Sequence, residues 1–170
     1  MRERDLGARD LAAFVRAAVA AARPGRVLVN DRLDVALTAG ADGVHLRATS
    51  LPAAAARAVA SRLGRPDFLI GVSTHAVDEA REAEAGGADF VVAGPVFETP
   101  SKLPYGPPLG PDRFAEVCRA VRIPVLAIGG INLENFREPL SRGAAGVAAI
   151  GMLSDPRAVA RTVRELLTQG

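Results

Sequence analysis

The sequence predicts an α/β protein with parallel strands, of the TIM-type (β/α)8-barrel class, on three observations. Short apolar runs alternate with helical patterns along its 170 residues. Three segments repeat a Gly-Ala step followed by an apolar run. Polar and glycine residues gather directly after the predicted strand ends, which is where such a barrel carries its site. A doubly wound nucleotide-binding sheet is the alternative, but the sequence has neither of the glycine-rich nucleotide fingerprints.

The three repeated segments cover residues 39–46, 86–93 and 142–149. In each of them a glycine stands where a helical stretch would end, and glycine suits the left-handed position after a helix. The apolar run that follows is continuous rather than alternating, which is typical of a strand buried on both faces. Each segment therefore predicts the end of a helix followed by a parallel strand.

Six strands are expected, with helices between them. The strands are predicted at residues 26–29, 43–46, 68–72, 90–94, 124–128 and 146–150. Apolar residues at helical spacing predict helices over residues 6–22, 51–63, 76–85, 111–121, 133–141 and 156–168. Pro52, Pro111 and Pro156 stand near three of the helix starts, where the missing N–H of proline costs nothing.

Composition excludes several classes of protein. The chain has 21 Lys and Arg residues against 19 Asp and Glu, a net charge of +2, and no long basic run. We therefore expect neither nucleic acid nor a membrane surface as a partner. The one cysteine, Cys118, excludes an internal disulfide, and no apolar run reaches the ~18 residues of a membrane span. The charged start is unlike a signal peptide. We expect one cytoplasmic domain over residues 1–170.

Glycines near the end of the chain are candidates for a phosphate site. Gly129 and Gly130 close one predicted strand, and Gly151 closes the next, before a helix expected from Pro156. Backbone N–H groups beside glycines and at helix starts bind anions, and barrels often hold phosphate after their last two strands. Plain glycine turns are the alternative interpretation.

The longest irregular stretch covers residues 94–111 and holds Thr99, Ser101, Tyr105 and the single lysine, Lys102. A connection of this length suggests a functional loop. Its hydroxyl and ammonium groups could bind an anionic ligand. A solvated proline-rich loop is the alternative.

Four further polar residues follow strand ends. Asn30 and Asp31 come after the first strand, where a carboxylate can hold Mg²⁺ or where either side chain can cap a helix. His45 and His75 also lie at strand ends. Each histidine fits a structural role as well as a catalytic one.

The motifs together resemble the thiamine phosphate synthase/TenI superfamily. They are VNDRLDVAL from Val29, GADGVHL from Gly40, GVSTH from Gly71, GPVFETPSK from Gly94, AIGGI from Ala127 and GAAGVA from Gly143. The resemblance implies a (β/α)8 barrel. Because Arg2-Glu3-Arg4 resembles the end of the second strand of that barrel, we expect the first strand, first helix and second strand to be lacking and the domain to be N-terminally incomplete.

The resemblance also implies roles for particular residues. The synthase joins a hydroxymethylpyrimidine pyrophosphate to a thiazole phosphate and releases pyrophosphate, so small phosphorylated thiamine precursors are the expected partners. Asp31 matches one Mg²⁺ ligand. The pyrophosphate contacts match Arg2, Arg4, Asn30, Ser73 and Lys102; the thiazole contacts match Thr99 and Ser101; the thiazole phosphate cradle matches Gly129, Gly130, Ile150 and Gly151.

Two departures from the synthase pattern bear on the reaction. Ser50 stands where the synthase has a second metal-binding aspartate, which weakens the metal site and resembles the TenI branch with its thiazole tautomerases. The histidine of those tautomerases falls at Pro95.

Three interpretations follow. A TenI-type tautomerase-like enzyme leads, with His45 or His75 as base and Lys102 as a further catalytic candidate. A Mg²⁺-dependent thiamine phosphate synthase is the alternative, and a non-catalytic thiazole-phosphate binder is the third. Helix faces rich in Ala and Leu suit a homodimer and barrel packing equally well.

Overall fold

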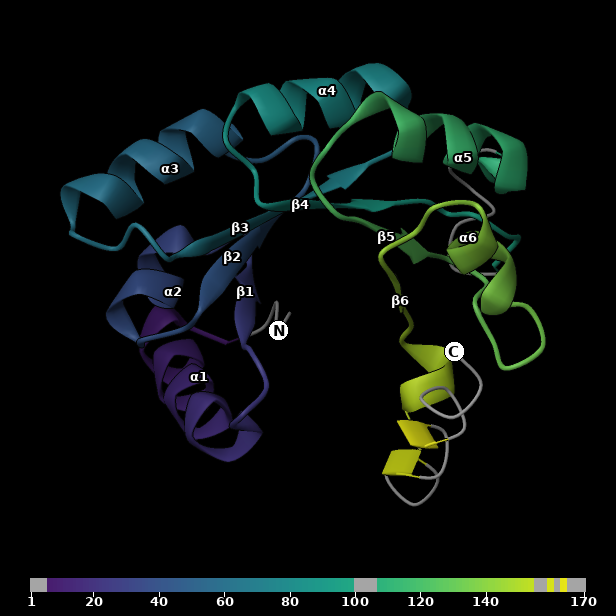
Figure 1. Ribbon diagram of the computed structural model, residues 1–170. Helices are drawn as coiled ribbons and strands as arrows, with labels where there is room; N and C mark the ends of the chain where they lie inside the picture. The colour runs from purple at the N-terminus through teal and green to yellow at the C-terminus, as the bar shows by residue number, and fades with distance from the viewer. Residues whose placement is uncertain (1–5, 100–106, 155–158, 161–162, 165–170) are drawn as a thin grey trace. The chain divides into compact units, whose positions relative to one another are not determined.

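The computed structural model describes residues 6–99, 107–154, 159–160 and 163–164. Of the residues singled out above, Arg2, Arg4, Ser101, Lys102, Tyr105 and Pro156 lie outside the described residues. The described elements are, in order, α1 (Ala8–Ala22), β1 (Leu28–Asn30), α2 (Leu33–Thr38), β2 (Gly43–Leu46), α3 (Ala53–Arg62), β3 (Leu69–Thr74), α4 (Val77–Ala85), β4 (Phe90–Ala93), α5 (Gly110–Ala120), β5 (Val125–Ile128), α6 (Arg137–Ser141), β6 (Gly146–Ala148) and the 3₁₀ turn η2 (Gly151–Leu153) (Figure 1).

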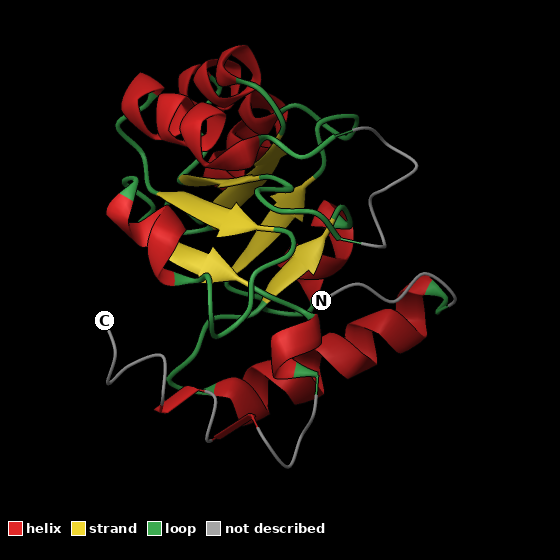
Figure 2. Ribbon diagram, turned by 90° about the vertical axis from the view of Figure 1, so that its right-hand side faces the viewer, coloured by secondary structure: helices red, strands yellow, loops and turns green. Residues whose placement is uncertain are grey.

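These elements confirm the predicted α/β class. Six strands are described, each overlapping a predicted run, and every connection from one strand to the next passes through a helix (Figure 2). The six-residue helix α2 was not predicted. The predicted helix at 133–141 begins only at Arg137, because Asn132 and Asn135 form a side-chain-capped turn ahead of it. The predicted final helix lies mostly outside the described residues.

Internal contacts divide the chain into two compact units. The first comprises residues 1–73 and 82–90, and the second residues 74–81 and 91–170. In the first unit β1, β2 and β3 are parallel neighbours in that order, with Asn30 opposite His45 and His45 opposite Gly71. In the second unit β4, β5 and β6 are likewise parallel, with Ile128 opposite Ala148. Within each unit the carboxyl ends of neighbouring strands therefore lie at one edge.

The repeated Gly-Ala segments are helix C-caps. Gly40, Gly87 and Gly143 have φ values of +74°, +83° and +102°, the left-handed conformation that glycine adopts without a Cβ clash. In each repeat the alanine after the glycine donates a hydrogen bond of 2.9–3.0 Å to the carbonyl five residues earlier. This is the Schellman pattern, which ends a helix and turns the chain toward the next strand. The sequence repeat therefore arises because the same turn is built three times.

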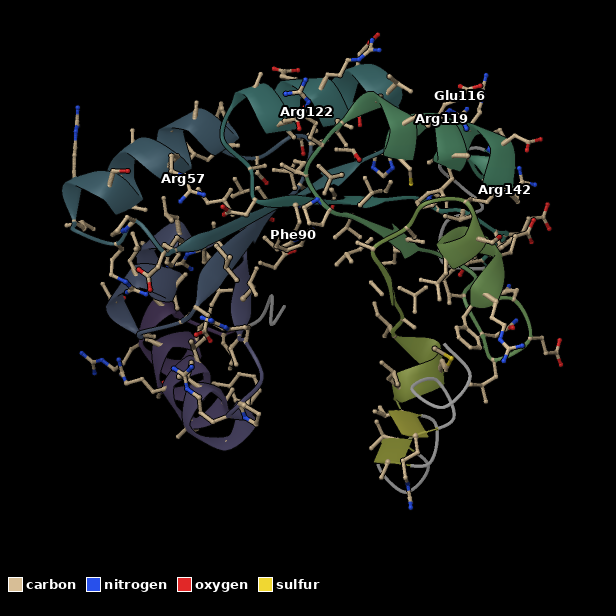
Figure 3. All side chains as sticks on the ribbon, viewed as in Figure 1. Arg57, Phe90, Glu116, Arg119, Arg122 and Arg142 are labelled. Atoms are coloured by element: carbon tan, nitrogen blue, oxygen red, sulfur yellow. The ribbon has the colours of Figure 1, made fainter. Side chains whose placement is uncertain are left out.

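Two aspartates of these repeats fasten the strands of the first unit. The carboxylate of Asp42 accepts a 2.8 Å hydrogen bond from the backbone of Val27, and burial opposes but does not cancel the resulting lowering of its pKa. Asp89 accepts 2.6 Å bonds from the backbone of Ile70 and from the guanidinium of Arg57, which reaches down from α3 (Figure 3). Because these carboxylates bind backbone N–H groups at strand starts, they act in folding rather than in chemistry.

Each unit has its own apolar core. Val29, Val44 and Ile70 are almost fully buried between the strands and helices of the first unit. Phe114 and Ala127 are buried in the second. Inner and outer residues of β2 and β4 are buried alike, as expected of parallel strands covered on both faces. Among the described helices, none combines the length and the apolar character needed to cross a membrane.

Candidate active site

The strand ends of the first unit bring together the polar residues predicted there. Asn30 ends β1, His45 lies opposite it on β2, and Ser73 is on β3. The backbone N–H of Asp31 donates a 2.9 Å hydrogen bond to the carbonyl of His45, which continues the ladder one step beyond the strand. We call Asn30, Asp31, His45, Arg47, Ser50 and Ser73 the strand-end cluster.

Asp31 is the centre of this cluster. Its φ is +60°, a left-handed conformation that Asp tolerates better than most side chains and that directs the chain from β1 into α2. The Asn30 amide donates a 2.9 Å bond to Oδ2 of Asp31, and the Arg47 Nε forms an ion pair with the same oxygen. The other oxygen, Oδ1, accepts bonds from the Ser50 hydroxyl and, at 3.2 Å, from the Arg47 backbone N–H.

The Asp31 carboxylate is ionised at neutral pH. Burial raises its pKa, but the hydrogen bonds from Ser50 and from the Arg47 backbone, with the charge of Arg47, outweigh burial and lower the pKa overall. The Asp31 side chain is 20 % exposed and that of Arg47 is 52 % exposed. The pair therefore joins a half-buried anion to a cation that faces solvent.

Arg47 is the residue that sequence reasoning missed. It stands at the start of the segment Arg47-Ala-Thr-Ser50, in which only position 50 departs from a family ligand and so draws attention in the sequence. The structure closes these four residues into a turn, because the Ser50 N–H donates a 3.0 Å bond to the Arg47 carbonyl. That turn directs both side chains to Asp31. The signal in the sequence was an arginine two residues beyond a histidine at a strand end.

His45 and Ser73 form the second pair in the cluster. Nε2 of His45 lies 2.8 Å from Oγ of Ser73. Burial lowers the pKa of His45, and the nearby Asp31 carboxylate opposes this without reversing it, so the imidazole is neutral at pH 7. The ring sits against Phe90, with 6.2 Å between ring centroids. Gly71 makes this packing possible, since a Cβ there would lie 2.3 Å from the Phe90 ring and 2.9 Å from Nδ1 of His45.

The cluster does not fit a Mg²⁺ ion as it stands. Mg²⁺ takes oxygen ligands in octahedral geometry, usually with one or two carboxylates. Asp31 is the one carboxylate of the cluster, and each of its oxygens already accepts two protein hydrogen bonds. Ser50 donates its hydroxyl proton to Asp31 instead of adding a second negative charge. Within the described part of the chain, no three His, Cys, Asp or Glu side chains gather in a way that could hold a metal.

The second unit contains the other histidine and the glycine-rich ends. His75 is exposed, its Nδ1 is hydrogen-bonded to the Gly94 carbonyl, and its backbone N–H donates a 2.6 Å bond to Glu79. These contacts connect the end of β3 to the end of β4. His75 and His45 therefore have different partners in different units, and the structure does not assign either of them the role of a general base.

The glycines expected to cradle phosphate follow neighbouring strands. Gly129 and Gly130 come after β5 with φ values of +97° and +67°, and a Cβ on either would lie under 3 Å from atoms of Pro95, Phe97 or Glu98. Ile150 is 79 % exposed, and Gly151 begins the short turn η2 after β6. Thr99 is half-buried at the end of the described part of the proline-rich loop. The phosphate role of Gly129, Gly130, Ile150 and Gly151 and the thiazole contact of Thr99 stay predictions.

The fold and the strand-end cluster together define the class of the protein. It is a parallel α/β protein of the (β/α)8-barrel type, with six strands described and polar side chains at their carboxyl ends, where enzymes of this class act. A family model described as thiamine monophosphate synthase matches residues 1–153, and the chain belongs to this family of thiamine-pathway enzymes.

Individual relatives agree with the family. The thiamine-phosphate synthase of a Roseiflexus species is 41 % identical over 98 % of this chain and 71 % of its own length. That of Chlorobium phaeovibrioides is 44 % identical over 98 % of this chain and 80 % of its own length. The solved structure of a thiamine phosphate pyrophosphorylase from Pyrococcus furiosus superposes with a TM-score of 0.87 at 34 % identity, covering 99 % of this chain and 79 % of that one.

These relatives correct the leading interpretation from the sequence. The presence of Ser50 favoured a TenI-type tautomerase, but the relatives carry the name of the synthase across nearly the whole chain. The synthase, which was the alternative, is therefore supported better than the tautomerase. Ser50 favoured the wrong branch because the six motifs are shared by the whole superfamily and do not by themselves separate the synthase from the TenI branch.

Proposed function

We propose that the protein is a thiamine-phosphate synthase, joining hydroxymethylpyrimidine pyrophosphate to thiazole phosphate with release of pyrophosphate. The observation that carries the proposal is the strand-end cluster, in which amide, hydroxyl and guanidinium donors from three neighbouring strand ends lie in two hydrogen-bonded groups, one around Asp31 and one formed by His45 and Ser73. Such donors suit an anion, and family membership selects the diphosphate among anions.

In this reaction the cluster would stabilise the departing pyrophosphate. Negative charge grows on pyrophosphate as its bond to the pyrimidine methylene breaks, and fixed donors aimed at that charge lower the barrier. Asn30, Arg47 and Ser73 are the proposed donors. His45 holds the Ser73 hydroxyl through the 2.8 Å contact and is a positioning residue in this scheme.

The glycines after β5 and β6 are the proposed site for the thiazole phosphate. At Gly129 and Gly130 the backbone passes so close to the segment after β4 that a Cβ at either position would clash with it. Lys102, Arg2, Arg4 and Ser101, which lie outside the described residues, keep the roles that the resemblance implies.

The test is a synthase assay on the purified chain with both phosphorylated substrates, run with Mg²⁺ and with EDTA. Formation of thiamine phosphate is the expected result. A folded protein whose melting temperature rises with thiazole phosphate, but which forms no product under either condition, would contradict the proposal and favour the binder.

A second assay distinguishes a tautomerase from a synthase. Incubation with thiazole phosphate carboxylate would change the absorbance of the thiazole without any pyrimidine substrate. We expect no such change, because the resemblance places the tautomerase base at Pro95, and a proline side chain has no acidic or basic group to transfer a proton.

A further inference from the structure

The strand-end cluster does not fit a Mg²⁺ ion, and the structural cause is the guanidinium of Arg47. Its Nε forms the ion pair with Oδ2 of Asp31 and so takes up a carboxylate oxygen that a divalent cation would need. The backbone of Arg47 is held at the same place, since its N–H is shared between Oδ1 of Asp31 and the Ser50 hydroxyl, each at 3.2 Å. The cation is thus part of a built turn.

The charge of the cluster is already balanced. Asp31 contributes one negative charge and Arg47 one positive charge, while Asn30, Ser50 and Ser73 are neutral and the pKa of His45 is lowered. An aspartate at position 50 would leave a net negative charge for Mg²⁺, but a serine does not. A divalent ion entering the cluster would therefore meet no net negative charge and would have to displace the guanidinium.

The Nη nitrogens of Arg47 are available as hydrogen-bond donors to a ligand. The ion pair with Asp31 uses Nε, and among the described residues no acceptor is recorded for either of its Nη nitrogens. A guanidinium fixed along one edge and open along the other binds phosphate oxygens in a forked geometry. The side chain is 52 % exposed, so a ligand can reach it.

We infer that Arg47 replaces a divalent cation at Asp31, so that the protein binds the diphosphate of its substrate through the Arg47 guanidinium rather than through a protein-held Mg²⁺. This inference rests on the proposed function for the identity of the diphosphate. Asp31 serves in it as the anchor that orients Arg47. A Mg²⁺ ion bound to the diphosphate would then find no pair of carboxylates in the cluster, because Asp31 is the one carboxylate there.

The first experiment uses inorganic pyrophosphate as the probe and isothermal titration calorimetry as the readout, on the full chain in EDTA. We expect metal-free pyrophosphate to bind and Arg47→Ala to weaken the binding at least tenfold. Arg47→Lys keeps the charge without the fork and should fall between the two. Arg32→Ala is the matched control, because Arg32 neighbours the site but pairs with Asp34 at 2.7 Å; its affinity should equal that of the wild type.

The second experiment uses Mn²⁺ as a spectroscopic substitute for Mg²⁺ and needs no substrate. Electron paramagnetic resonance should detect no tightly bound Mn²⁺ on the wild type and one bound ion on the double variant Arg47→Gly, Ser50→Asp. Circular dichroism establishes that each variant is folded, and the single variant Ser50→Asp, with Arg47 retained, should bind Mn²⁺ more weakly than the double variant.

The outcomes separate this inference from the proposed function. Pyrophosphate binding that requires Mg²⁺ in the wild type and persists in Arg47→Ala overturns the inference, even if thiamine phosphate is formed. Tight Mn²⁺ binding by the wild type overturns it as well. Metal-free binding through Arg47 without product formation leaves the inference standing and rejects the synthase.

Discussion

Nε2 of His45 and Oγ of Ser73 lie 2.8 Å apart, although 28 residues separate them in the chain. They meet because β2 and β3 are parallel neighbours and both residues stand near the carboxyl ends of those strands. The neutral imidazole fixes the hydroxyl of Ser73 at the edge where the other donors of the cluster gather. The contact joins the fold to the proposed chemistry and leads to the first prediction.

Acid should destabilise the protein through His45. Because its pKa is lowered in the folded state, the unfolded chain binds the proton more tightly, so this contribution to stability is complete above the ordinary pKa of about 6.5 and is lost as pH falls below it. The slope from one such group is at most about 1.4 kcal/mol per pH unit. Urea unfolding at several pH values from 7.5 to 5.5 should show a smaller decline in His45→Gln than in the wild type, and equal declines would contradict the prediction.

Gly71→Ala should disturb both packing and the site. The new Cβ would overlap the Phe90 ring and press on His45, so we expect a loss of about 1–3 kcal/mol in the free energy of unfolding, together with weaker pyrophosphate binding. Chemical denaturation and calorimetry measure the two effects. Gly7→Ala is the control, since no atom lies within 4 Å of a Cβ at that position. A Gly71→Ala protein with wild-type stability would show that the ring can move aside at no cost.

Asp31→Asn should lower kcat/KM roughly a hundredfold in the synthase assay, because a loosened Arg47 no longer meets the diphosphate in a fixed position. The folded protein should persist, since Asp31 is partly exposed and the amide keeps one acceptor oxygen. Asp34→Asn is the matched control: it removes a neighbouring, 64 % exposed carboxylate whose partner is Arg32. If the two variants lost equal activity, the loss would come from the general charge of the surface.

Gly130→Ala should abolish the rise in melting temperature that thiazole phosphate produces. Its Cβ would lie 2.6 Å from the backbone oxygen of Glu98 and would push the loop out of place. Gly64→Ala separates this clash from backbone strain, since Gly64 has φ +68° against +67° for Gly130 but no atom within 4 Å of its Cβ. Each substitution carries a strain of about 1–2 kcal/mol. Retained thiazole phosphate binding in Gly130→Ala would place the phosphate elsewhere.

The sequence predicted most of the fold because its signals are local. The cap glycines Gly40, Gly87 and Gly143 and the continuous apolar runs after them each report the conformation of a few neighbouring residues. Helix α2 was missed because it is six residues long and too short to show a helical period. Its start depends on Asp31, whose left-handed φ is held by contacts from β2 and from the turn at residues 47–50.

By itself, the sequence determined the α/β class, the order of the strands and of the described helices other than α2, and the gathering of polar residues at strand ends. It could do so because helix capping and strand burial are set by residues close together in the chain. Only the tertiary structure decided how Asp31 is used. Its two oxygens are shared out among Asn30, Arg47 and Ser50, and Ser50 comes 19 positions later. The distribution of hydrogen bonds around a carboxylate depends on the register of neighbouring strands and on the turns beyond them, and residue spacing does not record either one.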